Sequence, residues 1–136
     1  MNHVLIPIDG SPRSAQSLHA YRSILGSCGS TITLITVRED IDSRSPAILE
    51  QMRQESEIML RRFAHLLEGR TVKLVVRFGL PGEEILNYAH EHHIETIVMT
   101  TRTHSMRNAL MGSVAVYLVK HSDIPILVVP EKASLE

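Results

Sequence analysis

Five short apolar runs, distributed over 136 residues, constrain the fold of this chain more than any other feature. The runs are Val4–Ile8, Ile32–Val37, Val72–Val76, Thr96–Met99 and Ile126–Val129. Each is almost continuously hydrophobic and rich in β-branched residues, as are strands of a parallel sheet that is covered on both faces. The segments between them have helical periodicity. We therefore predict one α/β domain over residues 1–136, with a single five-stranded parallel sheet and helices on both faces.

The helical segments carry apolar stripes and start signals. One stripe comprises Leu18, Tyr21, Leu25 and Cys28, and a second comprises Ile48, Met52, Met59, Phe63 and Leu66. Each stripe lies on one helical face, as expected for a helix packed on a core. Serine before proline predicts helix starts at Ser11-Pro12 and Ser45-Pro46, and Leu80-Pro81 predicts a third.

Composition excludes several classes of protein. A net charge of −1 argues against nucleic acid as a partner, because a general polyanion binder carries a basic excess. No apolar run approaches the roughly 20 residues that span a membrane. The chain enters its first strand directly, which predicts no signal peptide, and Cys28 is its only cysteine. A cytoplasmic location is the expectation.

The most informative polar segment follows the fourth run. It carries Arg102, His104 and Arg107 and leads into Gly112-Ser113, where a helix is predicted to begin. A basic loop before a helix start favours bound phosphate, but the same residues also suit a solvated surface loop. Asp9, after the first run, has two interpretations as well: it can accept hydrogen bonds from a ligand or cap the following loop.

Other chemistries have weaker support. His90, His92 and His93 invite a metal interpretation, but a histidine run at a helix end more often faces water, so we predict no metal site. The sequence contains no nucleophile elbow and no Walker phosphate loop, and we predict no catalytic residue. A phospho-receiver domain would need an aspartate after the third strand, where Arg77-Phe78-Gly79 stands.

With these residues in place, the chain resembles the universal stress protein family over essentially its whole length. The resemblance is carried by four segments: Val4–Ser11, Phe78–Ala89, Ile97–Met99 with Gly112–Ala115, and Asp123–Pro130. It implies a half-Rossmann fold with strand order 3-2-1-4-5 and a homodimer paired through the fifth strand. That pairing would cover Ile126–Val129, which is otherwise an exposed apolar edge.

The resemblance also implies an ATP site, with Mg present only with the nucleotide. Asp9 and the backbone of Val37 would hold adenine, Pro7 would line its pocket, and Met99 and Thr100 would flank the ribose. Thr103, Gly112, Ser113 and Val114 would surround the phosphates.

The chain departs from the family pattern at the phosphate end. Thr100 and Thr103 stand where the two leading glycines belong, and eight residues rather than nine separate Thr103 from Gly112. Threonine in a left-handed conformation would cost roughly 1–3 kcal/mol. The resemblance therefore implies a dimeric stress-response regulatory module with weak or altered ATP binding. The alternatives are a homodimer that binds no nucleotide and acts through protein contacts and, last, a slow ATP hydrolase.

Overall fold

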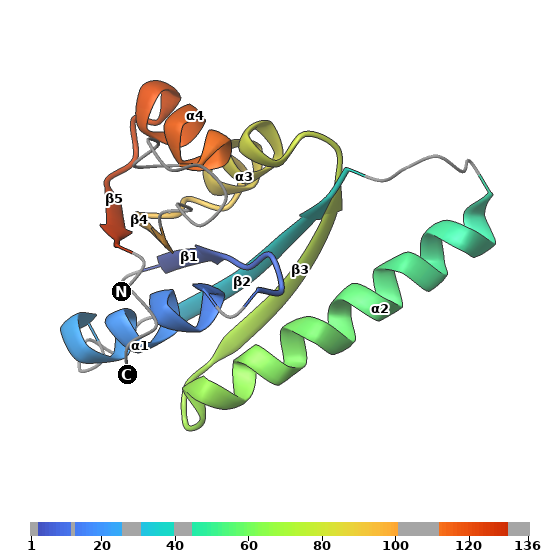
Figure 1. The fold of residues 1–136 in the computed structure, drawn as a ribbon, viewed down its shortest axis with the longest axis horizontal. Coiled ribbons are helices and arrows are strands. Elements are labelled where there is room, and N and C mark those ends of the chain that lie inside the picture. Colours follow the sequence, from blue (N-terminus) through green and yellow to red (C-terminus); the bar gives the residue numbers. More distant parts are fainter. Residues whose placement is uncertain (1–2, 12, 26–30, 40–44, 101–111, 131–136) are drawn as a thin grey trace.

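The computed structural model describes residues 3–11, 13–25, 31–39, 45–100 and 112–130. In this part of the chain, strands and helices alternate (Figure 1). The strands are β1 (His3–Pro7), β2 (Thr31–Arg38), β3 (Val72–Phe78), β4 (Thr96–Thr100) and β5 (Ile126–Val129). The helices are α1 (Arg13–Leu25), α2 (Pro46–Ala64), α3 (Pro81–Glu91) and α4 (Ser113–His121), with a 3-10 turn at His65–Leu67. Cys28 lies outside the described residues.

The five strands form one parallel sheet in the order β3-β2-β1-β4-β5. The predicted sheet and strand order are therefore confirmed. The register leaves the strand ends staggered. Pro7, the last residue of β1, pairs with Ile35, whereas β2 continues to Arg38 beside Phe78 of β3. β2 thus extends beyond the end of β1.

Two apolar layers separate the sheet from its helices. On one face, Leu18 and Tyr21 of α1 and Leu60 of α2 pack with Ile6 and Leu34. On the other face, the layer joins α3 and α4 to the strands through Ile85, Leu86, Leu118, Leu5 and Ile35. The prediction of helices on both faces is confirmed. Successive side chains of a strand enter opposite layers, and both layers are apolar. The five runs are therefore almost continuously hydrophobic.

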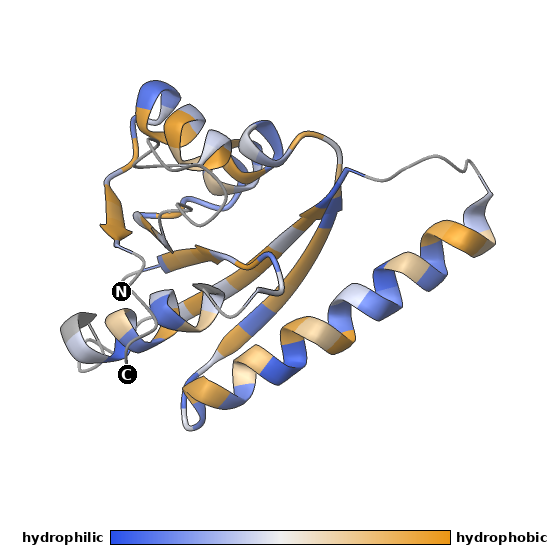
Figure 2. Cartoon of the chain, viewed as in Figure 1, coloured by the Kyte–Doolittle hydropathy of each residue, from blue (hydrophilic) through white to orange (hydrophobic). Residues whose placement is uncertain are grey.

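The predicted apolar stripe on α2 is only partly covered. Met59 and Phe63 pack against the core, and Leu60 is fully buried. Ile48, by contrast, is 46% exposed. Figures 1 and 2 show why: the amino-terminal end of α2 extends beyond the sheet and still carries hydrophobic residues. The helical period marks an apolar face but does not say how far the sheet reaches beneath it.

Helices α3 and α4 approach each other closely at a glycine. A Cβ atom built on Gly82 would lie 2.4 Å from Cδ1 and 2.8 Å from Cγ of Tyr117. These distances are far inside van der Waals contact, so only glycine permits the observed approach. The proline at the first position of α3 confirms the predicted helix start.

Helix α3 ends in a Schellman-type turn. His93 has a φ of 55°, and the amide of Ile94 donates to the carbonyl of Ala89 at 2.9 Å. Ile94 then enters the core, where it is 6% exposed. The histidine run thus marks the place where the chain leaves α3 and turns towards β4.

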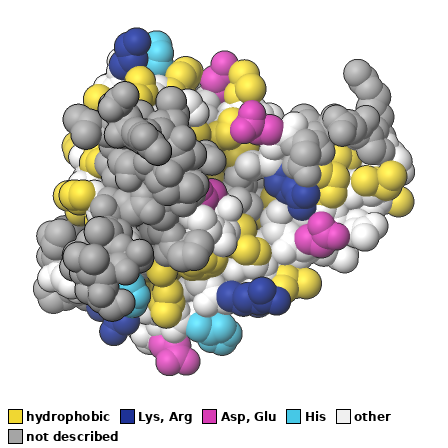
Figure 3. All heavy atoms as spheres, viewed as in Figure 1, with side chains coloured by type: hydrophobic (Ala, Val, Ile, Leu, Met, Phe, Trp, Pro, Cys, Tyr) yellow, Lys and Arg dark blue, Asp and Glu magenta, His cyan; other side chains and the backbone are white. Residues whose placement is uncertain are grey.

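The two edges of the sheet differ in character. β3 carries Lys73 and Arg77, and such charges on an edge strand discourage pairing with another chain. β5 consists only of Ile126, Leu127, Val128 and Val129, all partly exposed. Over the part of the chain that the structure describes, no helix combines the length and apolar character needed to cross a bilayer. Acidic and basic side chains are interspersed on the face seen in Figure 3.

Candidate functional site

A cavity of about 190 Å³ opens at the carboxyl ends of β1, β2 and β4, beside the amino-terminal ends of α3 and α4. This is where parallel α/β sheets bind ligands, because the strand order reverses there. Most of its lining is apolar: Pro7, Ile8, Ile35, Val37, Pro81, Ile85, Met99, Val114 and Ala115. The remaining residues are Asp9, Ser14, Ser17, Glu39, Thr100 and Gly112.

The structure brings most of the sequence-predicted site residues together. The predicted residues that line the cavity are Pro7, Asp9, Val37, Met99, Thr100, Gly112 and Val114. Ser113 is exposed at the first position of α4 and does not line it. Thr103 and the predicted basic residues Arg102, His104 and Arg107 lie outside the described residues. The juxtaposition agrees with the prediction, but the ligand-binding role of these residues remains a prediction.

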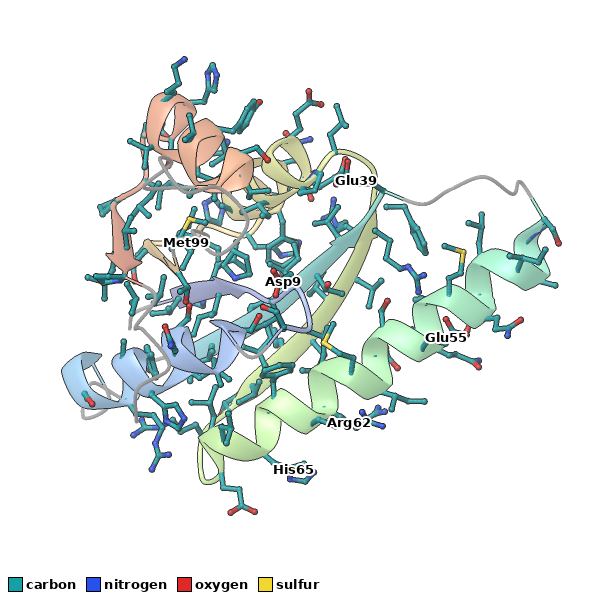
Figure 4. All side chains as sticks on the ribbon, viewed as in Figure 1. Asp9, Glu39, Glu55, Arg62, His65 and Met99 are labelled. Carbon is teal, nitrogen blue, oxygen red and sulfur yellow. The ribbon has the colours of Figure 1, made fainter. Side chains whose placement is uncertain are left out.

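Asp9 stabilises the loop between β1 and α1. Its Oδ1 accepts hydrogen bonds from the Ser11 amide at 2.9 Å, the Ser11 hydroxyl at 2.6 Å and the Ser14 hydroxyl at 2.9 Å. The Asp9 amide in turn donates to Ser14 Oγ at 3.1 Å. The sequence left two interpretations of Asp9 open, and these hydrogen bonds show that its Oδ1 atom caps the loop. Figure 4 shows Asp9, Glu39 and Met99 on three different segments around the site.

Thr100 is hydrogen-bonded to helix α1, which covers the sheet face opposite to α3 and α4. Its Oγ1 hydrogen-bonds to the hydroxyl of Ser17, which is 1% exposed. Thr100 also ends β4 in extended conformation, and among the described residues only His93 is a non-glycine with positive φ. The expected strain from threonine at a glycine position was therefore wrong for Thr100. Because Thr100 lines the cavity, its side chain changes the shape and polarity of the cavity wall relative to glycine.

The backbone of Val37 faces the cavity. The Ile35 carbonyl accepts from the Ile8 amide at 2.8 Å, towards β1, and the Arg38 carbonyl accepts from the Gly79 amide at 2.9 Å, towards β3. Because successive backbone groups of a strand point to opposite sides, the N–H and C=O of Val37 point towards β1. β1 has already ended, at Pro7. The stagger of the sheet thus leaves one backbone donor and one backbone acceptor facing the cavity.

Helix α4 begins at the cavity with Gly112 as its N-cap. Glycine has no side chain to satisfy the first amides, and no side-chain cap is observed. The backbone of Gly112 is extended, with φ −75° and ψ 173°. Free amides and the positive end of the helix dipole favour a negatively charged group at this position.

The histidines of α3 have separate surroundings. His90 Nε2 lies 2.8 Å from Asp123 Oδ1, and this hydrogen bond lowers the pKa of the Asp123 carboxyl. His92 stacks on Tyr88 with ring centres 4.1 Å apart. His93 forms the turn after the helix. In the described segments no group of histidine, cysteine and acidic residues is arranged to hold a metal ion.

Sequence reasoning missed three polar residues of the cavity: Ser14, Ser17 and Glu39. A signal for the serines was present, because Ser11, Ser14 and Ser17 recur every three residues at the start of α1. Glu39 could have been found from Val37, since side chains two residues apart on an extended segment share a face.

Comparison with known proteins agrees with this architecture. The model of the universal stress protein family matches residues 1–130. Universal stress protein MJ0531 of Methanocaldococcus jannaschii is 26% identical over 93% of this chain and 80% of its own length. The solved structure of protein MJ0577 of the same organism superposes with a TM-score of 0.83 at 24% identity over 98% of both chains. A universal stress protein in complex with cAMP has a TM-score of 0.77 at 19% identity, covering 96% of this chain and 98% of that protein.

Proposed function

This chain belongs to the universal stress protein family, and we propose that its cavity binds the adenosine portion of a nucleotide as part of a regulatory module. The observation that carries the proposal is the free backbone edge of Val37. A donor and an acceptor side by side match the ring nitrogen and the amino group of adenine. The apolar residues on both sides, Pro7 and Met99 among them, suit the faces of the ring.

A single phosphate has a natural position at the start of α4, where the amides after Gly112 are uncapped. A structural relative holds cAMP, which carries one phosphate. ATP would bring more negative charge to this position than a single phosphate does and would meet the Thr100 side chain rather than a glycine. We propose that ATP binds weakly, with Mg only as its counterion.

Thermal unfolding with and without ligand tests this proposal. At 100 times its dissociation constant a ligand adds about 2.7 kcal/mol to the free energy of unfolding. We expect AMP or cAMP to raise the melting temperature, and Val114→Trp to abolish the shift by blocking the cavity. The matched control is Val116→Trp, because Val116 lies on the same helix, is 41% exposed and does not line the cavity. No shift with any adenine nucleotide at millimolar concentration would refute nucleotide binding.

We further propose that β5 pairs with β5 of a second copy to form a homodimer. The strand is an apolar edge without the charges that protect β3. Val128→Lys should give monomers in sedimentation, whereas Val119→Lys, on an exposed position of α4, should not. An unchanged mass for Val128→Lys would count against this interface.

If the dimer forms and no nucleotide binds, a module that acts through protein contacts becomes the better description. A slow ATP hydrolase ranks behind both. The Asp9 carboxylate is the obvious candidate for a base, but its Oδ1 is already bonded to two serines.

A further inference from the structure

Glu39 is an acidic residue of the cavity, and no contact within the described part of the fold accounts for its carboxylate. It follows β2 directly and lines the cavity together with Val37. Its neighbour Arg38 points the other way, donating to the Met52 carbonyl at 3.2 Å and to Glu55 at 3.4 Å. The alternation of an extended segment therefore places Val37 and Glu39 on the α3–α4 face.

The Glu39 carboxylate has no structural partner among the described residues. Asp9, the other acid of the cavity, is committed through Oδ1 to Ser11 and Ser14. On the same face of the sheet, Glu84 and Glu91 are both bonded to Arg77. Glu39 makes no hydrogen bond or ion pair with the described residues. An exposed carboxylate at the rim of an apolar cavity is an acceptor that can bond to a ligand without breaking an internal contact.

We propose that Glu39 selects the base: its carboxylate accepts a hydrogen bond from the exocyclic amino group of the purine whose edge is held by the backbone of Val37. This inference rests on the proposed nucleotide function. An amino group has two hydrogens. In this arrangement one hydrogen would be donated to the C=O of Val37 and the other to the carboxylate of Glu39, which lines the cavity two residues further along the chain.

The chemistry of this arrangement is selective. A carboxylate only accepts hydrogen bonds, so it favours a 6-amino purine. A 6-oxo purine would place oxygen lone pairs against both the Val37 carbonyl and the Glu39 carboxylate. Sites built around a hydrogen bond reject the analogue that lacks the donor, because the acceptor is then left unpaired.

A thermodynamic cycle in ligand and protein tests the assignment. The ligands are adenosine and purine riboside, which lacks only the amino group, and titration calorimetry gives the dissociation constants. In the parent protein, adenosine should bind more tightly than purine riboside. Glu39→Ala should reduce this ratio by about tenfold, the size of one hydrogen bond to a charged group. Glu39→Gln retains an acceptor and should retain part of the preference.

The control is Glu68→Ala, which removes the same charge from an exposed residue at the amino-terminal edge of the sheet. It should leave both dissociation constants unchanged. If the parent binds both ligands and Glu39→Ala weakens them equally, or changes neither, the assignment of Glu39 is overturned while nucleotide binding stands. If the parent binds neither ligand, the proposed function fails and this inference fails with it.

Discussion

Substitution of Gly82 by alanine tests how tightly α3 and α4 are packed beside the cavity. The new methyl group would lie 2.4 Å from one ring carbon of Tyr117 and 2.8 Å from Cγ. Carbon atoms in contact are about 3.5–4.0 Å apart, so the ring or the helix must move by about 1 Å. Cγ is fixed close to the backbone, and a simple rotation of the ring about its own axis does not remove this contact.

The expected cost follows from two opposing effects. Overpacking a core by one methyl group costs about 1–3 kcal/mol. Alanine in place of glycine returns up to about 1 kcal/mol of helix propensity. We expect a net loss of about 1–2 kcal/mol in the free energy of unfolding. For a chain of this size this corresponds to a decrease of about 3–8 °C in melting temperature.

Urea denaturation of four proteins measures the effect: the parent, Gly82→Ala, Tyr117→Ala and the double variant. The cost of Gly82→Ala should nearly disappear when Tyr117 is already truncated, since the methyl group then enters vacant space. Asn87→Ala, on the exposed face of α3, controls for helix propensity. A Gly82→Ala protein as stable as the parent, or an equal cost in both backgrounds, would refute the steric argument.

Three further predictions concern single side chains. The Tyr21 hydroxyl is buried without a hydrogen-bond partner among the described residues, so Tyr21→Phe should be neutral or stabilising by up to about 1 kcal/mol in thermal melts, and a clear loss would reveal a missed partner. His93→Gly should stabilise by about 1 kcal/mol in urea denaturation because φ is 55°, and His93→Ala should give no such gain. The hydrogen bond from Arg77 lowers the pKa of the Glu91 carboxyl, so the pair adds stability above the ordinary pKa of 4.5 and loses it as the pH falls through the lower folded value. Glu91→Gln should therefore be less stable than the parent near pH 7 but not near pH 2, and a pH-independent difference would contradict this.

The sheet could be predicted from the sequence because its strands are short, apolar and separated by clear helical segments. Their order came from family resemblance, since periodicity carries no information on which strands are neighbours. The limits of β2 were harder to predict. Arg38 looks like a loop residue in sequence, yet its backbone pairs with β3 while its guanidinium reaches α2.

The site was predictable where it depends on position in the fold and less so where it depends on side-chain contacts. Residues at strand ends, such as Asp9 and Thr100, could be placed from the topology alone. Their hydrogen bonds to Ser14 and Ser17 could not, because those bonds depend on how α1 lies across the sheet. Thr100 has an ordinary extended backbone because it pairs with Val129 of β5 as the last residue of β4.

The overhang of β2 past β1 has an evolutionary consequence. A peptide group is present whatever the amino acid, so exchanging the Val37 side chain leaves its N–H and C=O in place unless proline is introduced. Removing this backbone edge requires an insertion that lengthens β1 or a deletion that shortens β2. Sequence drift can therefore reshape the rest of the cavity while this donor and acceptor are inherited through strand length.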